Sequence, residues 1–324
     1  MYHTAFIDEN NDVYVFGNNH YGQCIPNSDQ EFIANPTKLD IKAISVACSS
    51  KYTIIVTTDG EVYHYGKIQF STDQVKKIKI CKKVVSAYCS DTNVLLVTED
   101  NEVYGYGSNS FYQLSDKKDY CYQDNPFKLE IIDPISIGCG SGFIVYINMD
   151  QDVFVMGNQH GCPSTDPIMK LQMKAARVLC GENDSVLFTK ENDVYLRCKR
   201  GLAYIKHPFK AIHASFCRNY VVFILENFDL YGMGHNEHVT NIIYKQEHIT
   251  GTNYYFTPYK AIYTISGTNH LIIVNENEEI FVGGSNDLHQ LEFNKSHGLN
   301  KLPIDVKMLI PKKRVSTKSA RNMI

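Results

Sequence analysis

The sequence lacks the features that identify most membrane proteins, secreted proteins and zinc proteins. It contains no tryptophan, and its ten cysteines include no Cys-x-x-Cys pair, which argues against structural zinc. No stretch approaches the roughly 20 apolar residues of a membrane span. The start, MYHTAFIDEN, has no basic segment followed by an apolar run, so we expect no secretory signal. Ten cysteines without such a signal favour an intracellular, reducing compartment, cytoplasmic and/or nuclear.

Catalytic signatures are also missing. The chain has no G-x-x-x-x-G-K-[ST] phosphate-binding loop, and GCGSG at 138–142 has its serine offset from a G-x-S-x-G elbow. HNEH at 235–238 and His248 supply imidazoles, but a metal site needs ligands that converge in space rather than in sequence. We therefore predict no catalytic residue, no metal and no cofactor.

Charge is uneven along the chain. The net charge is −3, yet the tail IPKKRVSTKSARNMI (310–324) is basic and has no apolar periodicity, so residues 311–324 are predicted to be disordered. Its basic residues are Lys312, Lys313, Arg314, Lys318 and Arg321. Three interpretations stay open: a nuclear-import signal in PKKR, contact with nucleic acid, or simple solubilisation, each adjustable by phosphorylation of Ser316, Thr317 or Ser319. Nucleic-acid contact is expected only through this tail.

One short motif recurs along the whole chain. An acidic residue, an apolar residue and usually an aromatic open each copy, and in most copies a glycine closes it: DVYVFG (12–17), EVYHYG (61–66), EVYGYG (102–107), DVFVMG (152–157), DVYLRC (193–198), DLYGMG (229–234) and EIFVGG (279–284). An apolar run such as TIIVTT or VLLVTE precedes each copy, with a short Asp/Asn/Gly turn between, which is typical of a β-hairpin. Seven copies at this period predict blades of a propeller.

A third apolar element precedes the hairpins, as in IKAISVACSS (41–50) and KKVVSAYCSD (82–91). The runs are apolar at odd and even positions alike, so both faces of each sheet should be buried, as in stacked blades. Four cysteines recur at one position of the third element, namely Cys48, Cys89, Cys139 and Cys180. We interpret them as small residues packed near a crowded axis rather than as reactive thiols.

The two ends of the repeat region complement each other. The chain begins with a hairpin that has no third element before it, and KLPIDVKMLI (301–310) has the missing strand character. Pairing of these N- and C-terminal strands would close the ring and remove its open edge. The prediction is an all-β, seven-bladed β-propeller over residues 1–310, followed by the tail, and no membrane segment.

The motifs carry a resemblance to a known family. With GNNHYGQC (17–24), GSNSFYQL (107–114) and GSNDLHQL (284–291) after the repeat glycine, the chain resembles the regulator of chromosome condensation repeat family over nearly all of residues 1–310. That family usually has tryptophan before the glycine, where this chain has Phe16, Tyr65, Tyr106, Met156, Arg197, Met233 and Gly283. The histidine typical of the preceding turn is kept at His270 and His3, and replaced by Tyr52, Asn93, Phe143, Asp184 and Tyr220.

The resemblance implies protein partners rather than one activity. The best-known representative is a nuclear nucleotide-exchange factor for the small GTPase Ran that also docks on chromatin, and other relatives are scaffolds, ubiquitin-ligase modules, photoreceptor partners or enzyme inhibitors. Fold alone does not choose among them. Our leading hypothesis is a monomeric, non-enzymatic propeller that binds partner proteins through rim loops. The alternative is a guanine-nucleotide exchange factor for a Ran-like small GTPase, with no exchange residue assigned.

Three surface features are candidate binding sites. The seven acidic residues that open the motif would form a ring that either attracts a basic partner or is merely solvated at the hairpins: Asp12, Glu61, Glu102, Asp152, Asp193, Asp229 and Glu279. The lysine-rich segment 75–85 is interpreted as a solvated edge or as a docking surface for phosphate or an acidic protein. The long aromatic connections 111–127 and 242–259 offer partner contacts at Tyr120, Tyr122, Tyr254, Tyr255 and Phe256, or else cover their own blades.

Overall fold

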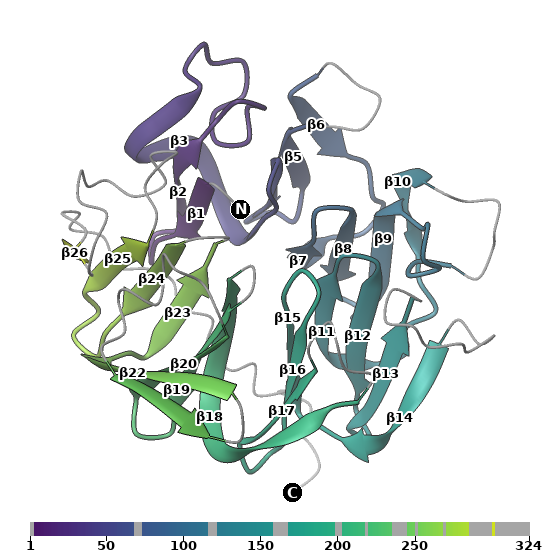
Figure 1. The fold of residues 1–324 in the computed structure, drawn as a ribbon. Coiled ribbons are helices and arrows are strands. Elements are labelled where there is room, and N and C mark those ends of the chain that lie inside the picture. The colour runs from purple at the N-terminus through teal and green to yellow at the C-terminus, as the bar shows by residue number, and fades with distance from the viewer. Residues whose placement is uncertain are drawn as a thin grey trace, which may run out of the picture.

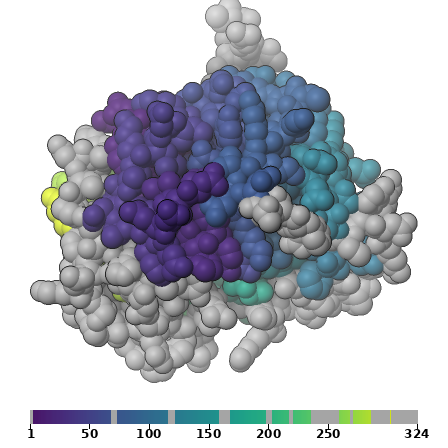
Figure 2. Space-filling model, turned by 90° about the horizontal axis from the view of Figure 1, so that it is seen from above, coloured from purple at the N-terminus to yellow at the C-terminus, as the bar shows by residue number. Residues whose placement is uncertain are grey.

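The structure is a computed structural model, and every element in it is a β-strand. It describes residues 3–67, 73–115, 122–157, 168–197, 203–217, 220–234, 245–249, 252–267, 270–284 and 300–301. The strands form antiparallel sheets arranged in a ring around a central axis, with consecutive sheets side by side (Figure 1). Figure 2, turned by 90°, shows atoms of the N-terminal half of the chain, coloured from purple to teal, following one another across one side of the molecule. The prediction of an all-β propeller is confirmed.

The described strands form five connected sheets. Dividing two of these at β3 and β18, where each strand changes its pairing partner, gives seven antiparallel groups, which we call units and number in chain order. Unit 1 contains β1 (His3–Ile7), β2 (Asp12–Asn18) and the first half of β3 (Phe32–Cys48). Unit 2 contains the second half of β3, β4 (Tyr52–Thr57), β5 (Val62–Gly66) and β6 (Val75–Ile78). Unit 3 contains β7 (Val84–Cys89), β8 (Asn93–Thr98), β9 (Val103–Ser108) and β10 (Tyr122–Lys128). Unit 4 contains β11 (Pro134–Gly140), β12 (Phe143–Asn148), β13 (Asp152–Met156) and β14 (Ile168–Lys174).

The remaining units follow the same plan. Unit 5 contains β15 (Arg177–Cys180), β16 (Ser185–Phe188), β17 (Asp193–Arg197) and the first half of β18 (Ile205–Cys217). Unit 6 contains the second half of β18, β19 (Tyr220–Leu225), β20 (Asp229–Gly234), β22 (Thr252–Lys260) and β21 (Lys245–Ile249). Unit 7 contains β23 (Tyr263–Ser266), β24 (His270–Val274), β25 (Ile280–Gly284) and β26 (Asn300–Lys301). Because β3 and β18 each belong to two units, one unit ends and the next begins inside these strands rather than at a strand boundary.

The repeated motif forms the central hairpin of every unit. Each hairpin turns at a residue with positive φ, as at Asn11 (64°), Asn101 (64°) and Gln151 (65°), and asparagine and glycine adopt this conformation with least strain. The glycine that closes the motif also has positive φ, 110° at Gly107, where a side chain would place its Cβ 2.3 Å from the carbonyl oxygen of Thr92. The glycine therefore permits close contact between backbones.

The hydrophobic core lies between neighbouring sheets rather than within one layer. The strand that precedes the repeated motif is the most buried strand of each unit, and every residue of β1, β4 and β8 is buried. Separate apolar clusters join units 2 and 3, 3 and 4, 4 and 5, 5 and 6, and 6 and 7. A further cluster joins unit 1 to both unit 2 and unit 7. The prediction that both faces of each sheet are buried is confirmed, and packing continues all the way round the ring.

The first and last units also meet through polar side chains. Thr4 Oγ1 lies 3.1 Å from His270 Nε2 across this seam, and His3 Nε2 lies 2.7 Å from Thr53 Oγ1 of unit 2. The two histidines occupy equivalent positions, since His3 pairs with Gly17 and His270 with Gly284. The predicted pairing of the N-terminal strand with residues 302–310 lies outside the described residues, as does the predicted disordered tail 311–324.

The polar motif after the repeat glycine stabilises a tight loop. The Oδ1 atom of Asn109 accepts hydrogen bonds from the backbone N–H groups of Leu114 (2.8 Å) and Ser115 (3.0 Å). Its Nδ2 donates to the Ser115 carbonyl at 3.0 Å. Asn19 makes the same bonds to Cys24, Ile25 and the Ile25 carbonyl in unit 1. These residue types are therefore explained by loop geometry, without a ligand.

Candidate functional site

The acidic residues that open the seven motifs are each bound to lysine. The lysines come from the outer strand of the same unit, and Glu102 also binds Lys82, which lies in the segment that precedes unit 3. The pairs are Asp12 with Lys38 and Lys42, Glu61 with Lys77, Glu102 with Lys82 and Lys128, Asp152 with Lys170 and Lys174, Asp193 with Lys206, Asp229 with Lys260, and Glu279 with Lys301. The predicted acidic ring is thus a ring of ion pairs, with much of its charge already compensated.

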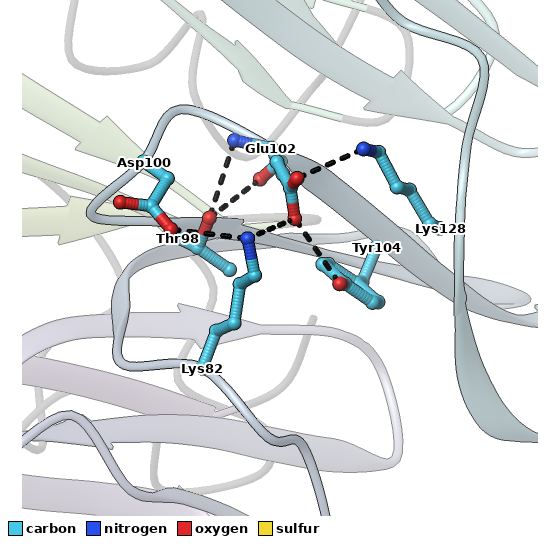
Figure 3. Close-up of polar contacts among 6 residues, drawn as sticks. All are labelled: Lys82, Thr98, Asp100, Glu102, Tyr104 and Lys128. Atoms are coloured by element: carbon cyan, nitrogen blue, oxygen red, sulfur yellow. Dashed lines mark hydrogen bonds and ion pairs between the residues drawn. The ribbon is translucent and has the colours of Figure 1, made fainter.

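The geometry of these ion pairs is clearest in unit 3 (Figure 3). Glu102 Oε1 lies 2.8 Å from Lys128 Nζ, and Oε2 lies 2.8 Å from Lys82 Nζ. Tyr104 donates its hydroxyl proton to Oε2 over 3.2 Å. Lys82 also contacts Asp100 at 3.0 Å. Hydrogen bonds from Lys128 and then Lys82 lower the pKa of Glu102 to about 2, so the carboxylate stays charged at any physiological pH.

The aromatic residue of the motif completes the cluster. It follows the acid by two positions and therefore points to the same face of the strand. In three units the lysine ammonium lies over this ring, 5.8 Å from the centroid of Tyr63 and 5.9 Å from those of Phe154 and Tyr195. An exposed cation over an aromatic ring adds about 0.5–1 kcal/mol. The acid, lysine and aromatic residue thus hold the outer strand onto each unit, a structural role that needs no partner.

The predicted aromatic contact residues lie in strands where the structure describes them. Tyr122 is half-buried in β10, and Tyr120 lies outside the described residues. Tyr254, Tyr255 and Phe256 lie in β22, opposite Met233, Gly232 and Tyr231. The assignment of residues 122–127 and 252–259 to loops is therefore wrong. Residues 122–127 belong to β10, and residues 252–259 belong to β22, where unit 6 extends its sheet by the hairpin β21–β22. Partner contact by these residues stays a prediction.

The lysine-rich segment also pairs within the chain. Residues 75–78 form β6, the outer strand of unit 2, as expected for an edge. Lys77 binds Glu61, Lys82 binds Asp100 and Glu102, and Lys76 donates to the Asp124 carbonyl at 2.9 Å. The basic tail residues 312–321 lie outside the described residues, so import and nucleic-acid contact stay predictions.

The centre of the ring holds a cavity of about 480 Å³. The four recurring cysteines Cys48, Cys89, Cys139 and Cys180 line it. Serines that follow them, Ser49, Ser90 and Ser141, also line it, as do Ser215 of β18 and Ser266 of β23. Burial raises the pKa of Cys48 to about 11 and of Cys139 to about 12, which keeps these groups as thiols. The prediction that the cysteines pack near the axis is confirmed.

Other sequence candidates can be placed only in part. HNEH at 235–238 and the side chain of His248 lie outside the described residues. Among the residues with described side chains, no group of three or more His, Cys, Asp or Glu is arranged to hold a metal ion. The described chain also contains no helix that is long and apolar enough to cross a membrane.

Large apolar side chains that face solvent were not anticipated from the sequence. They are Val75, Phe111, Ile132, Ile135, Met149, Ile205 and Phe228, with exposed fractions from 37% to 73%. Ile135 and Met149 belong to unit 4 and Ile132 to the segment that enters it, and Ile135 and Met149 directly follow Pro134 and Asn148, which pair with each other. These side chains are exposed because the chain departs from the repeat at this place. The departure becomes visible only when all units are aligned in space.

Comparison with known proteins agrees with this architecture. The regulator of chromosome condensation (RCC1) repeat matches residues 2–23. The structure is similar to human WBSCR16, with a TM-score of 0.75 and 13% identity over 90% of this chain and 94% of that chain. It is similar to Prp20p of Saccharomyces cerevisiae, with a TM-score of 0.76 and 15% identity over 93% of this chain and 88% of that chain. That protein was characterised for binding to Gsp1p and histones.

A second structure of the yeast protein, bound to Kap60, matches with a TM-score of 0.74 and 14% identity over 94% of this chain and 86% of that chain. At these identities the likeness establishes the fold, and the matched repeat at residues 2–23 adds the sequence motif. The chain therefore has the propeller fold of these proteins and carries, at residues 2–23, a sequence that matches the regulator of chromosome condensation repeat.

Proposed function

We propose that this protein is a non-enzymatic propeller that binds other proteins through its outer surface. The observation that supports this most is the group of exposed apolar side chains at the entry to unit 4, where Ile132 is 73% and Met149 is 64% exposed. Neighbouring exposed apolar side chains of this size are typical of interaction surfaces. The Kap60 complex of yeast Prp20 shows that a propeller of this fold binds a protein partner.

Affinity capture of the full-length protein from its native cells tests the proposal. Proteins retained at a fixed ratio should be purified and titrated against the propeller directly, because capture alone does not distinguish a partner from a contaminant. The aromatic contacts are tested by changing Tyr120, Tyr122, Tyr254, Tyr255 and Phe256 to serine, with thermal unfolding as a control for the strand positions. An absence of any direct binding partner would contradict the proposal. An unchanged affinity in the serine variants would reject these contact residues.

A second candidate function is guanine-nucleotide exchange on a Ran-like small GTPase. It is favoured by the similarity to Prp20p, whose binding to Gsp1p is part of that protein's description. Exchange needs no nucleophile, since a factor that binds the nucleotide-free GTPase more tightly accelerates nucleotide release. The test is release of a fluorescent GDP from Ran-like GTPases. No acceleration at micromolar propeller would exclude this function and leave the first proposal intact.

A further inference from the structure

The junctions between consecutive units follow a rule. The residue that opens the inner strand donates its N–H to a carbonyl of the preceding hairpin tip, over 2.9–3.1 Å. The pairs are Ala43 to Asn11, Val84 to Gly60, Ala175 to Gln151, Ala211 to Asn192, and Ala261 to Phe228. The residue before each donor is a lysine: Lys42, Lys83, Lys174, Lys210 and Lys260. Five of the junctions therefore combine the same backbone bond with a positive charge.

The junction between units 3 and 4 departs from this rule in two ways. Pro134 stands at the donor position and has no N–H to give. The side chain of Asn101 compensates by donating from Nδ2 to the Pro134 carbonyl oxygen at 3.1 Å. The preceding residue is the exposed Asp133, so a carboxylate stands where the other five junctions carry lysine. The contact between units is kept while the surface charge is reversed.

Three apolar side chains are exposed at the same place. Ile132 is 73%, Ile135 47% and Met149 64% exposed. Pro134 pairs with Asn148, so Met149 lies beside the Asp133 end of the neighbouring strand, and Ile135 lies at an irregularity in the pairing. The three side chains therefore belong to one small surface.

Equivalent positions elsewhere are polar or packed. The position of Met149 holds Glu9, Thr58, Glu99, Lys190, Glu226 and Glu276 in the other hairpin tips. The position of Ile135 holds the small Ala176 in unit 5 and Ile44, Val85, Ile212 and Ile262 in the other four junctions, and each of these four packs against a hydrophobic cluster. The exposure is thus a local exception rather than a property of the repeat.

Exposed carboxylates border this surface. They belong to Glu130, Asp133 and Asp150, each within two residues of one of the apolar side chains. The lysines that flank the surface are already bound to motif acids, Lys128 to Glu102 at 2.8 Å (Figure 3) and Lys174 to Asp152 at 2.8 Å. An apolar centre with a negative border favours a ligand that is apolar in the middle and positive at its edges.

We propose that this surface, which we call the Pro134 junction, docks a protein segment that presents apolar side chains with lysine or arginine beside them. The Pro134 junction consists of Ile132, Asp133, Pro134, Ile135 and Met149. The inference rests on the proposed protein-binding function and specifies the surface and the chemistry of the partner. The apolar side chains supply the affinity, and the carboxylates select the charge of the segment.

The test uses the full-length protein and three fluorescein-labelled peptides of equal length, composed of leucine and lysine, of leucine and glutamate, and of serine and lysine. Fluorescence anisotropy near physiological salt should show binding of the leucine–lysine peptide, with the other two at least roughly tenfold weaker. Asp133→Lys, which restores the residue of the other junctions, and the double variant Ile132→Ser, Met149→Ser should each weaken binding roughly tenfold. Ile205→Ser is the matched control, because Ile205 is 63% exposed in unit 5, and it should leave binding unchanged.

Equal binding of the leucine–lysine peptide by wild type and by both junction variants would overturn the inference, as would equal binding of the serine–lysine peptide. A concentration-dependent dimer that only the Ile132→Ser, Met149→Ser double variant abolishes would show that the junction binds a second copy of the chain. Sedimentation of the protein with phosphatidylserine vesicles would show that it binds a membrane surface. Either result would overturn the inference. Partners that the wild-type protein captures should not be captured by the Asp133→Lys variant. Partners captured equally by both would refute the junction while sustaining the proposed function.

Discussion

Acidification should destabilise this propeller well above the pH at which carboxylates titrate. His3, His270 and His64 are only 1%, 2% and 6% exposed. Burial lowers the pKa of His3 and His270 to about 3 and that of His64 to about 4. All three rings are therefore neutral in the folded protein at pH 5. His64 is held in this form between the hydroxyl of Tyr106 (3.2 Å) and the carbonyl of Lys67 (3.3 Å).

The sign and the size of the effect follow from linkage. In the unfolded chain a histidine titrates near pH 6.5, so below that pH the unfolded state binds protons that the folded state does not. The free energy of unfolding therefore falls as the pH drops from about 6.5 towards 4, and no loss is expected above pH 7. At pH 5 each ring accounts for about 2 kcal/mol, and the three together for roughly 6 kcal/mol. A folded domain has a total stability of about 5–15 kcal/mol.

Guanidinium unfolding at about pH 7.5 and about pH 5, followed by tyrosine fluorescence, measures this difference. The absence of tryptophan and the 22 tyrosines make tyrosine the natural probe. His64→Gln should recover about 2 kcal/mol of the loss, because it removes one titrating ring while keeping a polar side chain. His20→Gln is the control, since the His20 side chain is 59% exposed. A stability at pH 5 equal to that at pH 7.5 would refute the reasoning.

Three further predictions concern the glycine of the motif, the thiols and the tail. Gly107→Ala should lower the free energy of unfolding by about 1–3 kcal/mol, because alanine is strained at a φ of 110° and its Cβ would press on the Thr92 carbonyl; Ser110→Ala, at an exposed loop position, should not. A thiol reagent such as Ellman's should label the exposed Cys81 rapidly in the native protein, and should reach the buried Cys24 and Cys139 only on unfolding. Rapid native labelling of Cys24 and Cys139 would contradict their burial. Deleting residues 311–324 should shift a tagged protein towards the cytoplasm if PKKR is an import signal, and an unchanged distribution would reject that interpretation.

The hairpins could be predicted because their determinants are local. The turn residue with positive φ, the alternating strand and the closing glycine all fall within about a dozen residues of one another. The seven motifs therefore identified the hairpins of all seven units, and the acidic residue was correctly placed at the mouth of each. The recurring cysteines were informative for the same reason, since one position of the repeat reaches the axis in several units.

The environment of those acidic residues could not be predicted in the same way. Lys38 and Lys42 follow Asp12 by 26 and 30 residues, whereas Lys77 follows Glu61 by 16, so no fixed spacing links acid to base. The recurring acidic residues predict a charged ring. Only the register of the outer strand shows that each acidic residue is bound to lysine. The hairpin β21–β22 was missed because Gly and Asn between aromatic residues predict a loop as readily as a strand turn.

The Pro134 junction shows a different limit of sequence analysis. A single proline and a single aspartate carry little signal by themselves, and they become informative only when the other junctions define what is usual. The equivalent residues are found by the hydrogen bond from each inner strand to the preceding hairpin tip. Departures from a repeat are therefore best sought after its units have been superposed in space.

The strands β3 and β18, which each run through two units, restrict how this ring can vary in evolution. At these two places the chain passes from one sheet to the next without a connecting loop. An inserted residue there would shift the register of two sheets at once, whereas the long segment between β9 and β10 can lengthen without disturbing either neighbour. Homologues should accordingly keep constant length through residues 32–48 and 205–217 and concentrate their insertions elsewhere.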